Sequence, residues 1–131
     1  MPSIKAIEVR LDVASVARSA EFYADTLGFE VGTLWPSESP QFAILTRDGV
    51  RLQLGSREKN SVTAPSHPPC TLCLDVSGIN DLHSTIRDKV NIEWGPEVYF
   101  YHRREFAFRD PDGHLVILSE VTADAPTCKE D

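Results

Sequence analysis

The residues best suited to metal or nucleophilic chemistry are three cysteines and four histidines. Cys70 and Cys73 have the two-residue gap of a zinc-binding pair, but the sequence holds no second pair of this kind. Residues three apart in a strand point to opposite faces of the sheet, so we do not expect these two thiols to share a metal. The odd number of cysteines predicts free thiols rather than a disulfide framework.

The histidines are scattered over different predicted elements. They fall in a linker, on a helix, just before a strand and at a turn: His67, His83, His102 and His114. We expect each of them to be solvated or to cap a local backbone group, and His102 is the strongest candidate for a ligand. Two acidic residues in predicted strands, Glu8 and Glu105, could serve as general bases, although nothing in the sequence shows this.

Charge and hydropathy exclude two classes of partner. Thirteen basic and twenty acidic residues give a formal net charge of -7, the wrong sign for holding phosphate backbones. No apolar run approaches the roughly 18 residues of a membrane span, and the first residues lack the apolar stretch of a signal peptide. We therefore predict a cytoplasmic protein that binds neither nucleic acid nor membrane.

The chain contains one sequence pattern that is repeated once. Leu11-Asp12-Val13 is matched 63 residues later by Leu74-Asp75-Val76. Matches then continue at an offset of 64, where Phe42-Ala43 meets Phe106-Ala107 and Asp48-Gly49 meets Asp112-Gly113. Ordered identities with a single one-residue slip indicate a duplication rather than a coincidence between two ordinary strand and helix patterns.

Each copy predicts a strand, a helix and three further strands. Apolar and polar residues alternate over 7–13, and apolar residues then recur at helical spacing over 16–27 between Ser15 as N-cap and Gly28 as terminator. The remaining elements are predicted at 29–34, 41–46 and 50–55, and in the second copy at 70–76, 79–89, 92–99, 104–109 and 114–121. We thus expect one α+β domain over 1–121, with module one at about 4–56, a linker at 57–69, module two at 70–121 and a flexible tail at 122–131.

Two motifs carry a resemblance to a known family. The segment from Ser19 to Phe29, SAEFYADTLGF, is similar to the S-x-x-F-Y-x-x-x-L-G-F helix of the vicinal oxygen chelate superfamily, which includes glyoxalase I, extradiol dioxygenases and bleomycin resistance proteins. The segment from Phe108 to His114, FRDPDGH, resembles that family's F-x-D-P-D-G-N turn, with His114 in place of Asn. The resemblance covers about residues 4–120 and implies two tandem βαβββ modules that form a curved, cup-like mixed sheet with helices on its outer face.

The same resemblance indicates where a metal would bind. In metal-using relatives, the ligand positions of the first and last strand of each module correspond here to Glu8, Gln53, Thr71 and Ile117. Only Glu8 is anionic, and Ile117 has no donor atom at all. We therefore predict no metal cofactor, with a divalent ion as the alternative.

An organic molecule fits the predicted cup better than a bare ion does. Polar and apolar side chains would line it, and exposed aromatic residues would border it. The predicted ligand-binding residues are Glu8, Arg10, Trp35, Gln53, Thr71, Tyr101, Arg104 and Ile117. Two simpler interpretations remain open: Glu8 and Arg10 pair with each other or with Arg51, and the aromatic residues pack a dimer or anchor loops.

These features favour a metal-independent protein that binds a small organic molecule, cationic or aromatic, and that sequesters a drug or toxin. The bleomycin-resistance-like branch, to which Arg104-Glu105-Phe106 gives a weak resemblance, implies a homodimer. The alternatives are a metal-dependent lyase, isomerase or dioxygenase with an atypical site at Glu8 and Gln53 completed by His102 or by substrate, a metal-free enzyme that uses Glu8 or Glu105, and a protein-interaction role.

Overall fold

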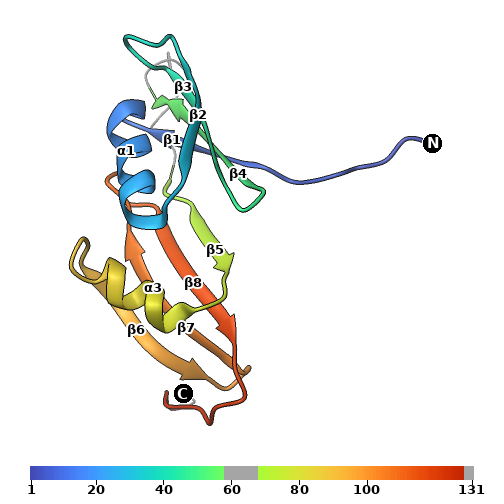
Figure 1. Cartoon of the computed structure of the whole chain (residues 1–131), viewed down its shortest axis with the longest axis vertical. Helices are drawn as coiled ribbons and strands as arrows, with labels where there is room; N and C mark the ends of the chain where they lie inside the picture. Colours follow the sequence, from blue (N-terminus) through green and yellow to red (C-terminus); the bar gives the residue numbers. More distant parts are fainter. Residues whose placement is uncertain (58–67, 129–131) are drawn as a thin grey trace. The chain divides into compact units, whose positions relative to one another are not determined.

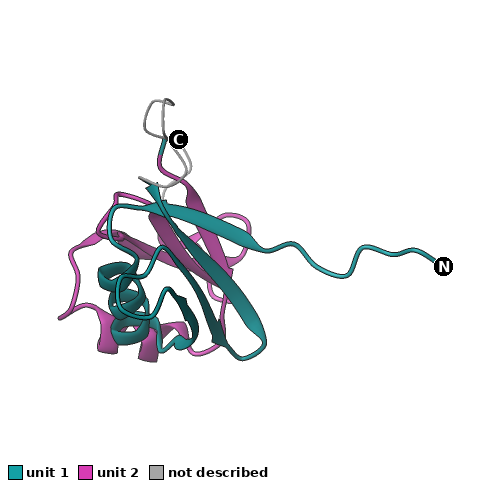
Figure 2. Cartoon of the chain, turned by 90° about the horizontal axis from the view of Figure 1, so that it is seen from above, with its two compact units in different colours: residues 1–68 teal, residues 69–131 magenta. Residues whose placement is uncertain are grey.

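The computed structural model describes residues 1–57 and 68–128, which belong to two compact units, 1–68 and 69–131 (Figure 2). Most of the predicted linker, with His67, and the last three residues of the predicted tail lie outside the described residues. Unit 1 contains β1 (Val9–Val13), α1 (Val16–Leu27), β2 (Glu30–Trp35), β3 (Phe42–Arg47) and β4 (Val50–Ser56). Unit 2 contains β5 (Thr71–Asp75), α3 (Ile79–Ile86), β6 (Ile92–Tyr99), β7 (Arg103–Arg109) and β8 (Leu115–Val121).

Both units have the predicted βαβββ order and form open, mixed four-stranded sheets (Figure 1). The strand order is β1-β4-β3-β2 in unit 1 and β5-β8-β7-β6 in unit 2. In each sheet the first strand runs parallel to the last strand of its unit, and the other neighbours are antiparallel. The α+β prediction with two modules is therefore confirmed.

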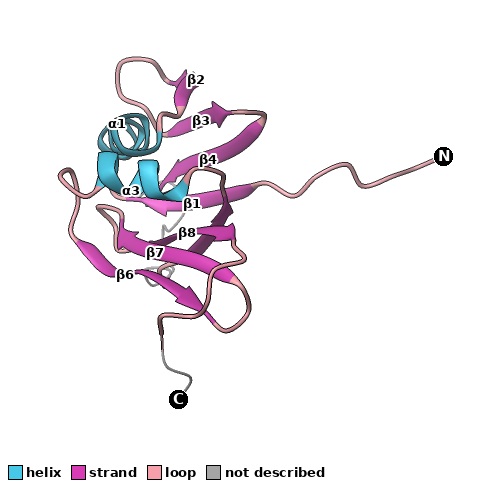
Figure 3. Ribbon diagram, turned by 60° about the horizontal axis from the view of Figure 1, so that its bottom comes forward, coloured by secondary structure: helices cyan, strands magenta, loops and turns pink. Residues whose placement is uncertain are grey.

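Apolar alternation places the core of unit 1 between its sheet and α1 (Figure 3). Leu11 and Leu54 are fully buried, as is Tyr23 on the facing side of the helix. The helix begins where the Ser15 hydroxyl accepts a hydrogen bond of 3.2 Å from the Arg18 N–H. It ends at Gly28, whose φ of 68° is the left-handed conformation that glycine tolerates. Both helix-end predictions are thus confirmed.

The first strand is shorter than the alternation predicts. Its pairing with β4 begins at Val9, which is opposite Leu52. Ile7 is 90% exposed and the residues before Val9 extend away from unit 1 (Figure 1). The prediction of a strand from residue 7 was wrong because alternation describes which side chains could be buried, whereas a strand also needs a partner for its backbone.

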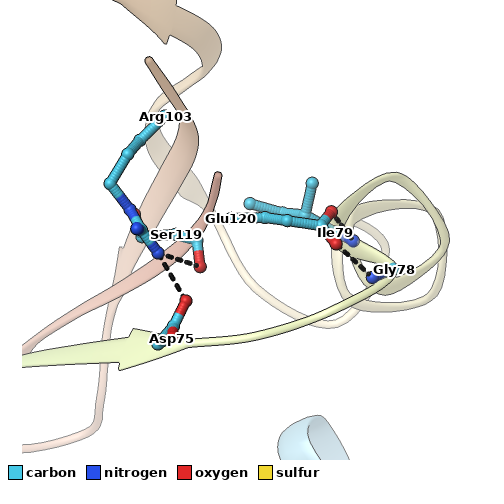
Figure 4. Close-up of polar contacts among 6 residues, drawn as sticks. All are labelled: Asp75, Gly78, Ile79, Arg103, Ser119 and Glu120. Atoms are coloured by element: carbon cyan, nitrogen blue, oxygen red, sulfur yellow. Dashed lines mark hydrogen bonds and ion pairs between the residues drawn. The ribbon is translucent and has the colours of Figure 1, made fainter. Parts of the chain in front are cut away.

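Unit 2 is built in the same way with a different helix cap. Gly78 has no side chain to cap α3, and the Glu120 carboxylate from β8 accepts hydrogen bonds from the Gly78 and Ile79 N–H groups at 3.0 and 3.1 Å (Figure 4). An anionic cap also complements the positive end of the helix dipole. Phe106 and Phe108 fill the core under this helix and are fully buried.

The strand registers show the duplication and correct its alignment. Asp12 lies opposite Gly55, and Asp75 lies opposite Ser119, so the first and last strands of the two units correspond at offsets of 63 and 64. The turn between the third and fourth strands is Asp48-Gly49 in unit 1 but covers 110–114 in unit 2. The extra length therefore lies in this turn, and not before the third strand as the sequence matches suggest.

This shift changes which residues are equivalent on the third strands. Phe42 lies opposite Gly55, and Ser119, the counterpart of Gly55, lies opposite Glu105. Glu105 is therefore the structural counterpart of Phe42, and the match of Phe42 to Phe106 is wrong. Phe106 is fully buried, whereas Phe42 lies on the half-buried, opposite face of its sheet. A one-residue slip exchanges the faces of a strand.

The segment predicted as a flexible tail is hydrogen-bonded to the edge of unit 2. The Thr127 N–H donates to the Val98 carbonyl at 2.9 Å, and the Val98 N–H donates to the Thr127 hydroxyl at 2.8 Å. Thr127 also donates from its hydroxyl to the Glu97 carboxylate at 2.6 Å. These contacts cover the outer edge of β6, which an unpaired strand would leave exposed.

We predict that Gly95→Ala destabilises the protein by about 2 kcal/mol or more, because a non-glycine residue at positive φ is strained and here also meets backbone. Gly95 has a φ of +82°, and a Cβ there would lie 2.3 Å from the Glu105 carbonyl oxygen and 2.8 Å from the Phe106 Cα. Gly49→Ala is the matched control, since its φ is +81° with no atom within 4 Å of the added carbon. Urea unfolding measures both variants, and equal losses would contradict the prediction.

Candidate ligand-binding faces

The face of unit 1 opposite α1 carries a connected row of polar side chains. The Arg10 Nε donates to Gln53 Oε1 at 3.0 Å, and Gln53 Nε2 donates to Glu8 Oε1 at 3.0 Å. The same Glu8 oxygen lies 3.3 Å from the Arg51 Nε. The Arg10 guanidinium also lies 4.8 Å from the centre of the Phe42 ring. Of the simpler pairings left open by the sequence, that of Glu8 with Arg51 is confirmed.

This row is a poor donor set for a divalent cation. Both ends of the Gln53 amide are used by protein groups, and the Glu8 carboxylate lies against a guanidinium. A metal would have to displace these contacts and would gain one anionic ligand. Within residues 1–57 and 68–128, no three or more His, Cys, Asp or Glu side chains are grouped so that they could hold a metal ion.

In unit 2 the corresponding face is mixed in character. The register places Cys73 beside Ile117 and Ala107 in one row, and Asp75 beside Ser119 and Glu105 in the next. Thr71 lies at the start of β5 on the same face. Thr71 and Ile117, which were predicted from the metal positions of relatives, therefore contribute a hydroxyl and an apolar side chain to this face.

Glu105 is the charged residue that this face buries most deeply. It is 7% exposed, and its Oε1 accepts a hydrogen bond of 2.5 Å from the Tyr101 hydroxyl. Burial and this hydrogen bond raise the pKa of Tyr101 well above that of an ordinary phenol. Burial, followed by the nearby Glu105 charge, likewise raises the pKa of the Cys73 thiol. Ionisation of either group would place a second negative charge near Glu105.

Tyr101, which donates to this carboxylate, belongs to a cluster of aromatic rings. Tyr99 and Tyr101 stack with ring centres 5.6 Å apart and planes 9° from parallel. Trp94 packs edge to face on Tyr99 at 6.0 Å, and Phe100 packs edge to face on Tyr101 at 5.2 Å. The rings come from the end of β6 and the three-residue loop that follows, in which His102 adopts a φ of 65°. Such loops commonly end in a left-handed residue.

Sequence reasoning missed Arg103, which connects β7 to Asp75 on β5 and to Ser119 on β8. Its guanidinium forms an ion pair with Asp75, and its Nε donates to the Ser119 hydroxyl at 2.5 Å (Figure 4). Arg104, which was predicted to bind ligand, lies on the other face of β7 and pairs with Asp124 at 2.7 Å. The alternation of β7 around Glu105 could have distinguished the two arginines.

The remaining predicted residues lie in separate places. Trp35 ends β2 opposite Phe42 and is 57% exposed, so unit 1 brings it to the face that holds Arg10. His114 is buried, and its Nδ1 accepts a hydrogen bond of 2.8 Å from the Cys70 N–H. It therefore fixes the start of β5, and the prediction that it caps a backbone group is confirmed.

Comparison with known proteins supports the fold-level interpretation. Residues 6–118 match the model of the Glyoxalase/Bleomycin resistance protein/Dioxygenase superfamily. The chain belongs to this superfamily. Family membership accounts for the paired βαβββ units, and it leaves open which ligand or reaction the family fold serves here.

Three individual proteins illustrate the range of similarity. An uncharacterised protein of Bacillus subtilis strain 168, YraH, is 26% identical over 90% of this chain and 99% of its own length. The crystal structure of TioX from Micromonospora sp. ML1 matches with a TM-score of 0.81 at 16% identity, covering 89% of this chain and 98% of TioX. A lactoylglutathione lyase from Agrobacterium tumefaciens matches with a TM-score of 0.73 at 16% identity, covering 92% and 96%. At such identities the two structures show a shared fold alone.

None of the helices in the described ranges is long and apolar enough to span a membrane. Cys70 and Cys73 are exposed free thiols. The prediction that they do not form a disulfide is therefore confirmed.

We predict that Tyr101 ionises after Tyr99, and well above the pH at which an ordinary phenol ionises, in an alkaline titration followed by phenolate absorbance near 295 nm. Because its folded pKa is raised above the unfolded value of about 10, this group stabilises the fold below that pH, and the contribution is lost as pH rises further. Tyr101→Phe should remove a step that lies above the ordinary phenol range, and Glu105→Gln should move that step to lower pH. A variant of Tyr101 that loses an early step instead would contradict the assignment.

Proposed function

We propose that this protein binds a small organic molecule without a metal ion and sequesters it, as a homodimer in the cytoplasm. The observation that carries the proposal is the use of Gln53: its amide oxygen accepts from Arg10 and its amide nitrogen donates to Glu8, so an ion at that position would compete with protein contacts. Unit 2 offers apolar and aromatic surface beside one deeply buried carboxylate, a combination typical of sites for organic ligands.

Family membership supports the coarser part of this proposal. The matched superfamily includes glyoxalases, bleomycin resistance proteins and dioxygenases, which makes small molecules the natural class of partner. The formal charge of -7 favours cationic or neutral molecules over anionic ones. Free, exposed thiols at Cys70 and Cys73 agree with a reducing compartment.

One observation favours a second candidate. Glu8 is an anionic side chain, 30% exposed, that lies just before β1 and accepts a hydrogen bond from Gln53 on β4. A metal-dependent lyase, isomerase or dioxygenase would use these two residues, with further donors from His102 or from the substrate. Arg51 would have to release the carboxylate for this to happen.

The two candidates differ in their response to chelation. We expect the purified protein to contain less than about 0.1 divalent ion per chain, and we expect its melting temperature to rise with planar organic compounds in EDTA as well as without it. Elemental analysis and thermal-shift screening measure these outcomes, and light scattering during gel filtration measures the dimer. One ion per chain that is lost in Glu8→Ala, together with ligand binding that EDTA abolishes, would establish the second candidate instead.

A further inference from the structure

Glu105 is a buried carboxylate that forms no ion pair with the residues that the structure describes. It is 7% exposed and, within residues 1–57 and 68–128, its one hydrogen bond comes from Tyr101. Charged side chains that are this deeply buried are normally paired, because an uncompensated charge loses its hydration. A neutral phenol supplies one hydrogen bond, and a carboxylate can accept about four.

The two neighbouring arginines on β7 are held elsewhere. Arg103 is engaged by Asp75 and Ser119 across the sheet (Figure 4). Arg104 lies on the opposite face of the strand and pairs with Asp124. Both contacts keep positive charge in the region while leaving Glu105 without an ion pair in the described part of the chain.

The fold does not require a carboxylate at this position. Its counterpart in unit 1 is Phe42, whose ring lies beneath the Arg10 guanidinium. The counterpart of Arg10 in unit 2 is Cys73, which is neutral at ordinary pH because its pKa is raised. In unit 1, therefore, the Phe42 ring contacts the Arg10 cation. In unit 2 the equivalent residue is the anionic Glu105, which has no ion pair within residues 1–57 and 68–128.

The surroundings of Glu105 suit a positively charged nitrogen next to a flat group. Tyr101 is 45% exposed, so the stacked pair with Tyr99 presents ring surface to solvent beside the carboxylate. Ring faces attract ammonium groups and also stack on planar ligands. These rings belong to the part of the β6–β7 hairpin that extends beyond its counterpart in unit 1, where the pairing ends at Trp35 and Phe42.

We infer that Glu105, Tyr99 and Tyr101 form a subsite of unit 2 for arylalkylamines, in which the carboxylate binds the protonated amine and the tyrosine rings contact the aryl group. This inference rests on the proposed function, whose ligand class it narrows. The protonated amine of the ligand is then the cationic partner of Glu105, which has none among the described residues.

Isothermal titration calorimetry in EDTA with three probes of similar shape tests the subsite: 2-phenylethylamine, 2-phenylethanol and 3-phenylpropanoate. The wild-type chain should bind the amine about tenfold or more tightly than the alcohol, since a hydrogen bond to a charged partner contributes about 1.5 to 3 kcal/mol. The propanoate should bind most weakly. Glu105→Gln, which keeps an acceptor for Tyr101, should remove the preference for the amine.

A matched control variant distinguishes the effect of the Glu105 carboxylate from the effect of the protein's net charge. Glu30→Gln changes the formal charge by the same amount at an exposed position of β2, and it should keep the wild-type preference. Tyr101→Phe keeps the ring but removes the hydroxyl that competes for Glu105 Oε1, so it should preserve or increase the preference. If Glu105→Gln does not fold, the Tyr101→Phe variant and the comparison of probes on the wild-type chain still test whether the subsite prefers the amine.

The outcomes also separate this subsite from the proposed function. Equal affinity of the wild type for amine and alcohol, or a preference that persists in folded Glu105→Gln, overturns the subsite. If none of the three probes binds while other planar compounds raise the melting temperature in EDTA, the subsite is wrong and the proposed function stands. If no compound of any charge binds, both are wrong.

Discussion

In the described ranges, 1–57 and 68–128, each sheet has two faces and one helix that packs on one of them, and the rest of the structure depends on that limit. Burying Leu11, Leu54 and Tyr23 in unit 1, or Phe106 and Phe108 in unit 2, stabilises the fold through apolar contact. The alternating geometry of a strand then forces the intervening residues to the opposite face. The faces available for ligands are therefore a direct consequence of how the core is built.

The two units use this second face differently. In unit 1 the polar groups satisfy one another, since Glu8, Gln53 and Arg10 form a continuous row of contacts. In unit 2 Arg103 forms its ion pair with Asp75. Within the described residues, the hydrogen bond that Glu105 accepts comes from the Tyr101 hydroxyl. The two units thus share one framework, and equivalent positions carry different residues: Phe42 in unit 1 and Glu105 in unit 2.

Much of the fold could be predicted because its signals are local. The Ser15 cap and the Gly28 terminator act within a few residues, and both are found where the sequence places them. The alignment of the third strands was wrong because identical residues at Phe42 and Phe106 outweighed a difference in turn length. The sequence likewise did not show that Arg103, and not Arg104, shares a face with Glu105, because the choice of face depends on register, which neighbouring strands determine.

The sequence by itself determined the duplicated βαβββ order, the residues of the core and the superfamily to which the chain belongs, because periodicity, caps and turn motifs need no distant partner. Only the tertiary structure decided that Glu105 corresponds to Phe42, that Glu120 caps α3 and that Glu105 is buried and accepts a hydrogen bond from Tyr101. These facts depend on which strands lie side by side. Hydrogen-bond register between residues far apart in the chain sets them, and composition or spacing along the chain does not record that register.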